Sequence, residues 1–173
     1  MPTSTKDFNA EALYRALLEQ VRAGIEGEQE TAIVGIYSGG AWLAERLAQD
    51  LGLEQRLGFI DVSFYRDDYA KKGLHPEVKP TQIGFNVDGA TIVLVDDVLY
   101  TGRTIRAALD ALFDHGRPKS VQLLVLIDRG HRELPIQATY TGRTIPTSKR
   151  EIIEVKLNEI DQQEQVLLVE LVD

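Results

Sequence analysis

Two adjacent carboxylates, Asp96 and Asp97, directly follow the apolar run Thr91–Val95. Adjacent carboxylates at the mouth of a buried strand repel one another and lose hydration, so they need hydrogen-bond donors or a cation nearby. The vicinal hydroxyl groups of a sugar would supply such donors. Asp96 and Asp97 are therefore candidates for holding the two hydroxyl groups of a ribose.

The segment after the acid pair is suited to a phosphate. It reads Val98, Leu99, Tyr100, Thr101, Gly102, Arg103 and Thr104, and it leads directly into an expected helix. The first N–H groups and the positive end of a helix favour an anion, and glycine lets the backbone bend close to it. Either part alone would often be a turn or a helix cap, which favour the same residue types. Together, the acid pair and this segment predict a ribose 5-phosphate site.

The same four residue types recur at Thr141-Gly142-Arg143-Thr144, but no buried strand and no acid pair precede them. We interpret this second copy as a turn. The sequence also lacks the Gly-Lys-Ser/Thr of a nucleoside triphosphate loop and the spaced glycines of a dinucleotide site.

Short apolar runs that alternate with helical patterns must position these residues. Strands are predicted at 32–36, 57–65, 91–95 and 121–127, and amphipathic helices at 8–25, through 42–47, and at 104–115. This alternation predicts an α/β fold with a mostly parallel sheet covered by helices on both faces. Ligands bind such sheets beyond the carboxyl ends of the strands, where the acid pair is expected.

Two regions depart from this alternation. The polar stretch 66–86 contains several glycines and prolines and reads as a long loop, and loops of that length often act as lids. The runs 151–157 and 166–172 flank a polar turn and predict a C-terminal β-hairpin. No repeat or linker interrupts the chain, so we expect a single domain over residues 1–173.

Composition narrows the function classes. The 173 residues include no cysteine, which excludes disulfides, thiolate nucleophiles and cysteine-held metals. No apolar stretch has the length of a signal peptide or a membrane span, so we expect a cytoplasmic protein with no membrane partner. The net charge of −8 repels nucleic acid on average, so any anion site must be local.

Several segments resemble a known family. The run Val93–Thr104 is similar to the phosphoribosyl pyrophosphate motif of type I phosphoribosyltransferases. Together with it, Asp61–Lys72, Leu126–Ile136 and Ile145–Lys149 resemble the PyrR family, whose members are pyrimidine operon attenuation proteins with uracil phosphoribosyltransferase activity. The resemblance covers most of the chain and implies the type I phosphoribosyltransferase fold with a small hood.

The resemblance implies transfer of ribose 5-phosphate from phosphoribosyl pyrophosphate to uracil, which gives uridine monophosphate (UMP) and pyrophosphate. Asp96 and Asp97 would hold the ribose, and Thr101–Thr104 would bind the 5-phosphate. The pyrophosphate loop would be Ser38, Gly39 and Gly40. Mg²⁺ would be required but held mainly by substrate oxygens and water, so no dedicated cluster of protein ligands is expected. We also expect a homo-oligomer.

Two further groups of residues follow from the resemblance. The hood would bring basic side chains to the pyrophosphate, with Arg66 joining the acid pair in catalysis beside Lys71 and Lys72, although an ordinary solvated charge cluster is an equal alternative. The base pocket would be lined by Asp128, Arg129, Gly130 and His131. His131 could equally be a structural or subunit-interface residue.

Three features of this sequence differ from the corresponding features of related families. Purine-type relatives usually have an acid directly before Thr-Gly, whereas this chain has Tyr100, which favours a pyrimidine. PyrR members often have an arginine in the pyrophosphate loop, where this chain has Ser38-Gly39-Gly40. Their RNA-binding face draws on a basic first helix, whereas the first helix here carries mixed and mainly acidic side chains.

Three functions therefore stay open. A uracil phosphoribosyltransferase is favoured by Tyr100 and the intact acid pair. An attenuator that binds pyrimidine operon leader RNA and senses uridine nucleotides, with catalysis retained or vestigial, is the second. Arg103, Arg143, Lys149 and Arg150 could form a small basic patch for it, although scattered surface charge is the favoured interpretation of these residues. A purine or orotate phosphoribosyltransferase is the least favoured.

Overall fold

A computed structural model describes residues 2–37, 39–62, 81–145, 147, 151–156 and 165–171. In chain order, the elements are β1 (Pro2–Asn9), α1 (Ala10–Gly24), β2 (Thr31–Ile36), α2 (Gly39–Leu51), the short 3₁₀ helix η1 (Glu54–Arg56), β3 (Leu57–Ile60), β4 (Thr91–Leu99), α4 (Arg103–Phe113), β5 (Ser120–Asp128), β6 (Tyr140–Thr144), β7 (Glu151–Lys156) and β8 (Gln165–Leu171). The predicted alternation of strands and helices is confirmed.

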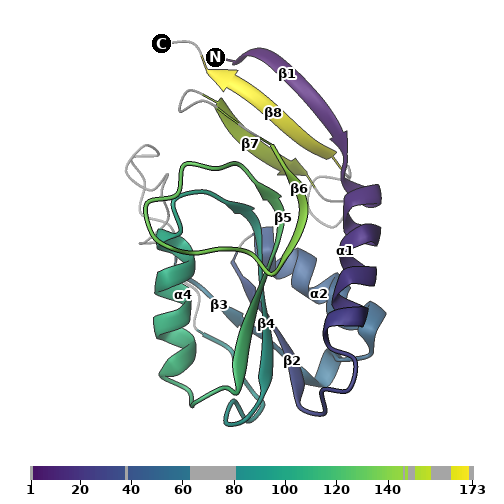
Figure 1. Ribbon diagram of the computed structural model, residues 1–173, viewed down its shortest axis with the longest axis vertical. Helices are drawn as coiled ribbons and strands as arrows, with labels where there is room; N and C mark the ends of the chain where they lie inside the picture. The colour runs from purple at the N-terminus through teal and green to yellow at the C-terminus, as the bar shows by residue number, and fades with distance from the viewer. Residues whose placement is uncertain are drawn as a thin grey trace.

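Five strands form the main sheet in the order β3-β2-β4-β5-β6, and every neighbouring pair is parallel. Helices α1 and α2 cover one face and α4 covers the other (Figure 1). All six residues of β2 are buried, as are the first six of β4, because a parallel strand between two helical layers has no solvent side. The predicted α/β fold is therefore correct.

Helix α1 begins two residues later than predicted. The side chain of Asn9 caps it by accepting a hydrogen bond from the backbone N–H of Ala12 at 3.1 Å. Its buried face packs toward α2, where the Tyr14 hydroxyl donates to Asp50 Oδ2 at 2.5 Å. Burial, reinforced by this hydrogen bond, raises the pKa of Tyr14, so the hydroxyl keeps its proton.

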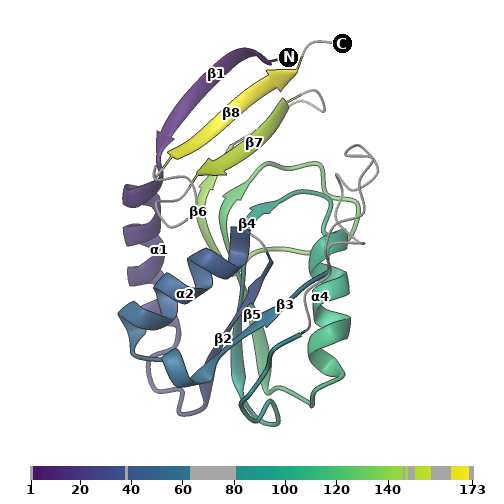
Figure 2. The same ribbon diagram turned by 180° about the vertical axis from the view of Figure 1, so that it is seen from behind.

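A second, antiparallel sheet has the order β1-β8-β7. Its β7–β8 hairpin confirms the predicted C-terminal hairpin, but β1 was not predicted, because residues 2–9 are mostly polar and show no alternation. The sheet lies beyond the carboxyl ends of the parallel strands, and β7 contacts β4 (Figures 1 and 2). This sheet therefore stands at the end of the molecule where the parallel strands present their last residues.

The prediction of a turn at residues 141–144 was wrong. These residues belong to β6, which pairs with β5 so that Thr141 lies opposite Val125 and Arg143 opposite Ile127. An edge strand has solvent on one side and tolerates polar residues, so it lacks the apolar signature of the central strands. Gly142 suits the pairing because a Cβ atom there would lie 2.5 Å from the carbonyl oxygen of Leu126.

Two other boundaries differ. Strand β3 ends at Ile60, earlier than the predicted limit of 65, and residues 63–80 lie outside the described part of the chain. Strand β4 continues past Val95 to Leu99 and pairs with β5 on both sides of Asp97. The acid pair therefore lies within the last residues of strand β4, where the backbone is paired with β5, and not in a loop.

Candidate active site

The two carboxylates at the end of β4 have different exposure. Asp96 is 2% exposed, whereas Asp97 is half-buried. Asp96 Oδ1 accepts a hydrogen bond from the backbone N–H of Asp97 at 2.8 Å, and Asp97 Oδ1 accepts from Val98 N–H at 2.8 Å. The backbone thus provides part of the hydrogen bonding that two adjacent acids need, and Asp97 is the more exposed residue of the pair.

The start of α2 packs directly on the acid pair. A Cβ atom at Gly39 would lie 2.1 Å from Asp97 Oδ2, and one at Gly40 would lie 2.3 Å from the carbonyl oxygen of Val95. Only glycine permits such a close approach. The structure therefore brings Gly39 and Gly40 of the predicted pyrophosphate loop together with Asp97, as the first two residues of a helix.

The predicted phosphate segment forms the entry to α4. Thr101 is 5% exposed, Gly102 adopts φ +96° as the residue before the helix, and Arg103 N–H donates to Thr101 Oγ1 at 3.2 Å. The first turn of α4 contains no acidic residue, which leaves its positive end available to an anion. The Arg103 side chain instead pairs with Glu133 at 2.8 Å. The backbone N–H groups and the threonine hydroxyls are thus the donors that this segment offers.

The loop that follows β5 lies against the loop that follows β4. Arg129 N–H donates to the carbonyl oxygen of Leu99 at 3.1 Å, and Asp128 Oδ1 accepts from Gly130 N–H at 3.0 Å. His131 has φ +66°, a left-handed conformation that is uncommon for a residue with a side chain. The predicted base-pocket residues and the predicted ribose-phosphate residues are therefore neighbours.

The ring of Tyr100 contacts two side chains of that loop. The Arg129 guanidinium carbon lies 4.1 Å from the ring centre, and the His131 ring meets it edge-on at 5.9 Å. Arg129 Nε donates to Thr147 Oγ1 at 3.1 Å, and His131 Nε2 hydrogen-bonds the carbonyl oxygen of Thr147. Thr147 lies between β6 and β7, so this cluster joins the site to the connection that leads into the second sheet.

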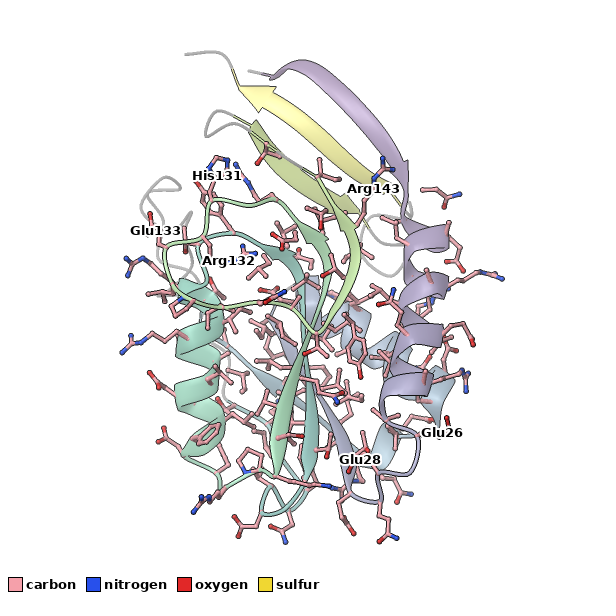
Figure 3. The ribbon with its side chains drawn as sticks, viewed as in Figure 1. Glu26, Glu28, His131, Arg132, Glu133 and Arg143 are labelled. Atoms are coloured by element: carbon pink, nitrogen blue, oxygen red, sulfur yellow. The ribbon has the colours of Figure 1, made fainter. Side chains whose placement is uncertain are left out.

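Sequence reasoning missed Arg132. Its guanidinium donates from Nη1 to the carbonyl oxygen of Tyr100 at 2.7 Å, from Nη2 to Asp128 Oδ2 at 2.7 Å and from Nε to the carbonyl oxygen of Ile136 at 2.8 Å. In Figure 3, Arg132 points into the molecule, whereas Glu133 points away from it. Two of its three acceptors are backbone oxygens, and such contacts cannot be recognised from residue types in the sequence.

The other predicted site residues are Ser38, Arg66, Lys71 and Lys72, and they lie outside the described residues, as do Lys149 and Arg150. Across the described ranges, no group of three or more His, Asp or Glu side chains could hold a metal ion, and no helix combines the length and apolarity needed to span a bilayer.

Comparison with known proteins identifies the family. The model of the phosphoribosyl transferase domain matches residues 5–160. The bifunctional protein PyrR of Thermus aquaticus is 50% identical over 163 residues, which cover 92% of this chain and 90% of that protein. The chain belongs to the PyrR family of phosphoribosyltransferases. The PyrR protein of Ralstonia nicotianae is similar as well, with 49% identity over 88% of each chain.

Solved structures agree on the fold. A hypoxanthine-guanine phosphoribosyltransferase from Bacillus anthracis has a TM-score of 0.70 at 21% identity, covering 99% of this chain and 100% of that one. A hypoxanthine phosphoribosyltransferase from Staphylococcus aureus has a TM-score of 0.66 at 20% identity, covering 96% and 91%. This PyrR-family chain therefore has the type I phosphoribosyltransferase fold.

Proposed function

We propose that this chain transfers ribose 5-phosphate from phosphoribosyl pyrophosphate to uracil, and that it also regulates pyrimidine operon transcription by binding leader RNA in response to UMP. Its membership of the PyrR family, at about half identity over nearly the whole chain, carries the proposal. The acid pair, the α4 entry and the start of α2 supply the parts that such a transfer needs within one site.

In the proposed reaction, the bond between uracil N1 and C1′ of the ribose forms while the bond from C1′ to pyrophosphate breaks, and the proton on N1 is released to solvent. Positive charge develops on the sugar ring, and a fixed carboxylate stabilises it more in the transition state than in the ground state. Asp97 is the more exposed residue of the pair and takes this role, while Asp96 supports it from the buried side. Residues Thr101–Thr104 bind the 5-phosphate through backbone N–H groups and hydroxyls.

The leaving group is assigned to the start of α2. Gly39 and Gly40 let the start of α2 lie against Asp97 and the end of β4, and backbone N–H groups of the loop Ser38–Gly40 are proposed to bind the pyrophosphate. Arg66, Lys71 and Lys72 are proposed to reach the pyrophosphate from the hood.

The carboxylates of the site are oxygen donors of the kind that suits magnesium, and the ion is proposed to be held mainly by substrate oxygens and water. When bound, Mg²⁺ would neutralise charge on the pyrophosphate.

The base is assigned to the loop after β5. Asp128, Arg129, Gly130 and His131 are proposed to line its pocket, with Tyr100 beside them. Tyr100 stands where purine-type relatives usually have an acid, and this supports a pyrimidine. The two hypoxanthine phosphoribosyltransferases compared above are 21% and 20% identical to this chain, and at such low identity the likeness concerns the fold alone.

A panel of bases tests the catalytic part. With phosphoribosyl pyrophosphate and Mg²⁺, we expect uracil to give UMP and pyrophosphate, and hypoxanthine, guanine and orotate to react far more slowly. Preferred turnover of a purine or of orotate would overturn the proposed substrate. Absence of turnover with every base would favour an attenuator with vestigial catalysis.

A gel-shift titration tests the regulatory part. We expect pyrimidine operon leader RNA to bind more tightly when UMP is present, in a salt-dependent manner because phosphate contacts dominate. No shift at moderate salt, with or without UMP, would reject the RNA role and leave the transferase proposal intact. We further infer a cytoplasmic homo-oligomer in which residues 1–173 form one domain.

A further inference from the structure

We propose that Arg132 is a positioning residue that locks the base-pocket loop onto the ribose-phosphate loop and thereby sets uracil against C1′ of the ribose. The inference rests on the proposed function, since it concerns the alignment of that function's two substrates. Arg132 itself is not assigned a contact with either substrate.

The side chain of Arg132 binds three parts of the chain at once, and we call this arrangement the clamp. Three nitrogen atoms of the guanidinium donate to three acceptors from different parts of the chain, the carbonyl oxygens of Tyr100 and Ile136 and the carboxylate of Asp128, all at 2.7–2.8 Å. Because the guanidinium is planar and its N–H directions are fixed, engaging three edges leaves it little freedom to rotate. The acceptors are therefore fixed relative to one another.

Burial strengthens these contacts. The side chain of Arg132 is 24% exposed and that of Asp128 is 17% exposed, in contrast to the Arg103–Glu133 pair nearby, where both side chains are more than half exposed. The second oxygen of Asp128 accepts from Gly130 N–H. Asp128 is thus held from two directions, by Arg132 and by its own loop, and it is the last residue of β5.

The segment after Arg132 also wraps over the phosphate entry. The N–H groups of Glu133 and Leu134 donate to the carbonyl oxygen of Thr101 at 2.9 and 3.1 Å. A Cβ atom at Gly102 would lie 3.0 Å from Cγ1 of Ile136, the residue whose carbonyl oxygen Arg132 holds. The clamp therefore helps to fix both the backbone of Tyr100 and the segment that lies over Thr101 and Gly102.

Because Arg132 joins these two loops, its loss is expected to disturb the alignment of the two substrates. Tyr100 directly precedes the phosphate-binding residues, and Asp128 begins the loop assigned to the base. Displacement of one loop against the other would leave each substrate bound but would separate uracil N1 from C1′, and misplacement by about 1 Å can cost roughly 100-fold in rate. The expected signature is a loss of kcat with little change in either KM.

The test compares Arg132→Gln and Arg132→Lys with Arg117→Gln, which makes the same charge change at an exposed residue at the opposite end of the sheet. We expect Arg132→Gln to lower kcat by roughly 10- to 100-fold, with the KM for uracil and for phosphoribosyl pyrophosphate each changed by less than about threefold. Arg132→Lys should recover part of the loss, because one ammonium group can reach some of the three acceptors. Arg117→Gln should match the wild type.

Amide hydrogen exchange provides a second readout that needs no turnover. Peptides covering residues 99–105 and 128–136 should exchange faster in Arg132→Gln, while those from β2 should not. A kcat within twofold of the wild type, unchanged exchange at 99–105, or faster exchange throughout the protein would overturn the positioning role. If the wild type itself does not use uracil, the proposed function fails, and the exchange pattern still decides whether Arg132 joins the two loops.

Discussion

At the scale of single residues, the acid pair shows that adjacent side chains of one type can have different surroundings. Asp96 is almost completely buried, whereas Asp97 is more exposed and lies against the first residue of α2. The proposed reaction uses a carboxylate where positive charge develops, and Asp97 is the better placed of the two for that purpose.

Asp97→Asn should therefore keep the fold and lose turnover. Removal of one fixed group that stabilises transition-state charge typically costs about 100- to 1,000-fold in kcat, and the amide preserves size and hydrogen bonding. Steady-state kinetics at saturating substrates, with circular dichroism as the check on folding, measure this effect. Asp114→Asn, at an exposed aspartate that follows α4, removes the same charge and should leave kcat unchanged; equal activity of Asp97→Asn and the wild type would refute the assigned role.

The site residues that could be predicted from sequence are those adjacent in the chain. The acid pair, Tyr100 and the Thr101–Thr104 segment share one strand-to-helix connection, so composition and order identify them together. Arg132 could not be found in this way, because its interactions depend on carbonyl oxygens brought near by the pairing of β4 with β5. Side-chain contacts with a folded backbone become visible only when the sheet register is known.

At the scale of elements, close approaches fix how the helices sit on the sheet. Helix α1 reaches β6 at Gly24, where a Cβ atom would lie 1.8 Å from the Tyr140 hydroxyl oxygen. That hydroxyl donates to Gln122 Oε1 at 2.7 Å, and Tyr140 is 6% exposed. The ring therefore has little room to withdraw.

Gly24→Ala should destabilise the protein by about 1–3 kcal/mol, the usual cost of inserting a methyl group into a packed contact. Urea unfolding monitored by circular dichroism measures the change. Gly84→Ala is the matched control, because Gly84 is exposed and a Cβ atom there would meet nothing within 4 Å. A similar unfolding midpoint for the two variants would show that the α1–β6 contact can accommodate a methyl group, and it would contradict the expected destabilisation.

The strands differ in how well they could be predicted from the sequence. The central strands β2 and β4 were predictable because burial on both faces requires continuous apolar residues. Strands β1 and β6 were not, since β1 is polar and pairs with the far end of the chain, and β6 is a polar edge strand whose hydrogen bonds come from β5. Their formation depends on partners distant in sequence and not on a local pattern.

At the scale of the whole molecule, a polar latch joins separate elements at the end of the sheet opposite the candidate site. Glu28 Oε2 accepts from Lys119 Nζ at 3.0 Å and from the Thr91 hydroxyl at 3.2 Å, which connects the start of β4 with the turns before β2 and β5. The hydrogen bond and the charge of Lys119 lower the pKa of the Glu28 carboxyl. Folding therefore favours the ionised form of Glu28.

The stability contributed by this latch should depend on pH in a defined direction. A carboxyl whose pKa is lower in the folded state contributes fully above its unfolded pKa, about 4.3, and loses the contribution as pH falls through the folded value. Wild type and Glu28→Gln should therefore differ in urea midpoint near neutral pH and converge in acid.

Glu26→Gln is the control, since Glu26 lies on the same connection and makes no ion pair within the described ranges (Figure 3). It should change the midpoint less than Glu28→Gln does near neutral pH. A gap between wild type and Glu28→Gln that stays constant into acid would contradict the latch.

The pairing of β1 with β8 also has a consequence for biosynthesis. On the ribosome β1 is made before β8, so the first strand has no β8 partner until residues 165–171 have been made, and closing so long a loop carries an entropic cost. The parallel sheet can assemble while this second sheet is still incomplete. Because β8 lies between β1 and β7 in that sheet (Figure 1), a chain released before residues 165–171 would lack the strand that joins β1 to β7.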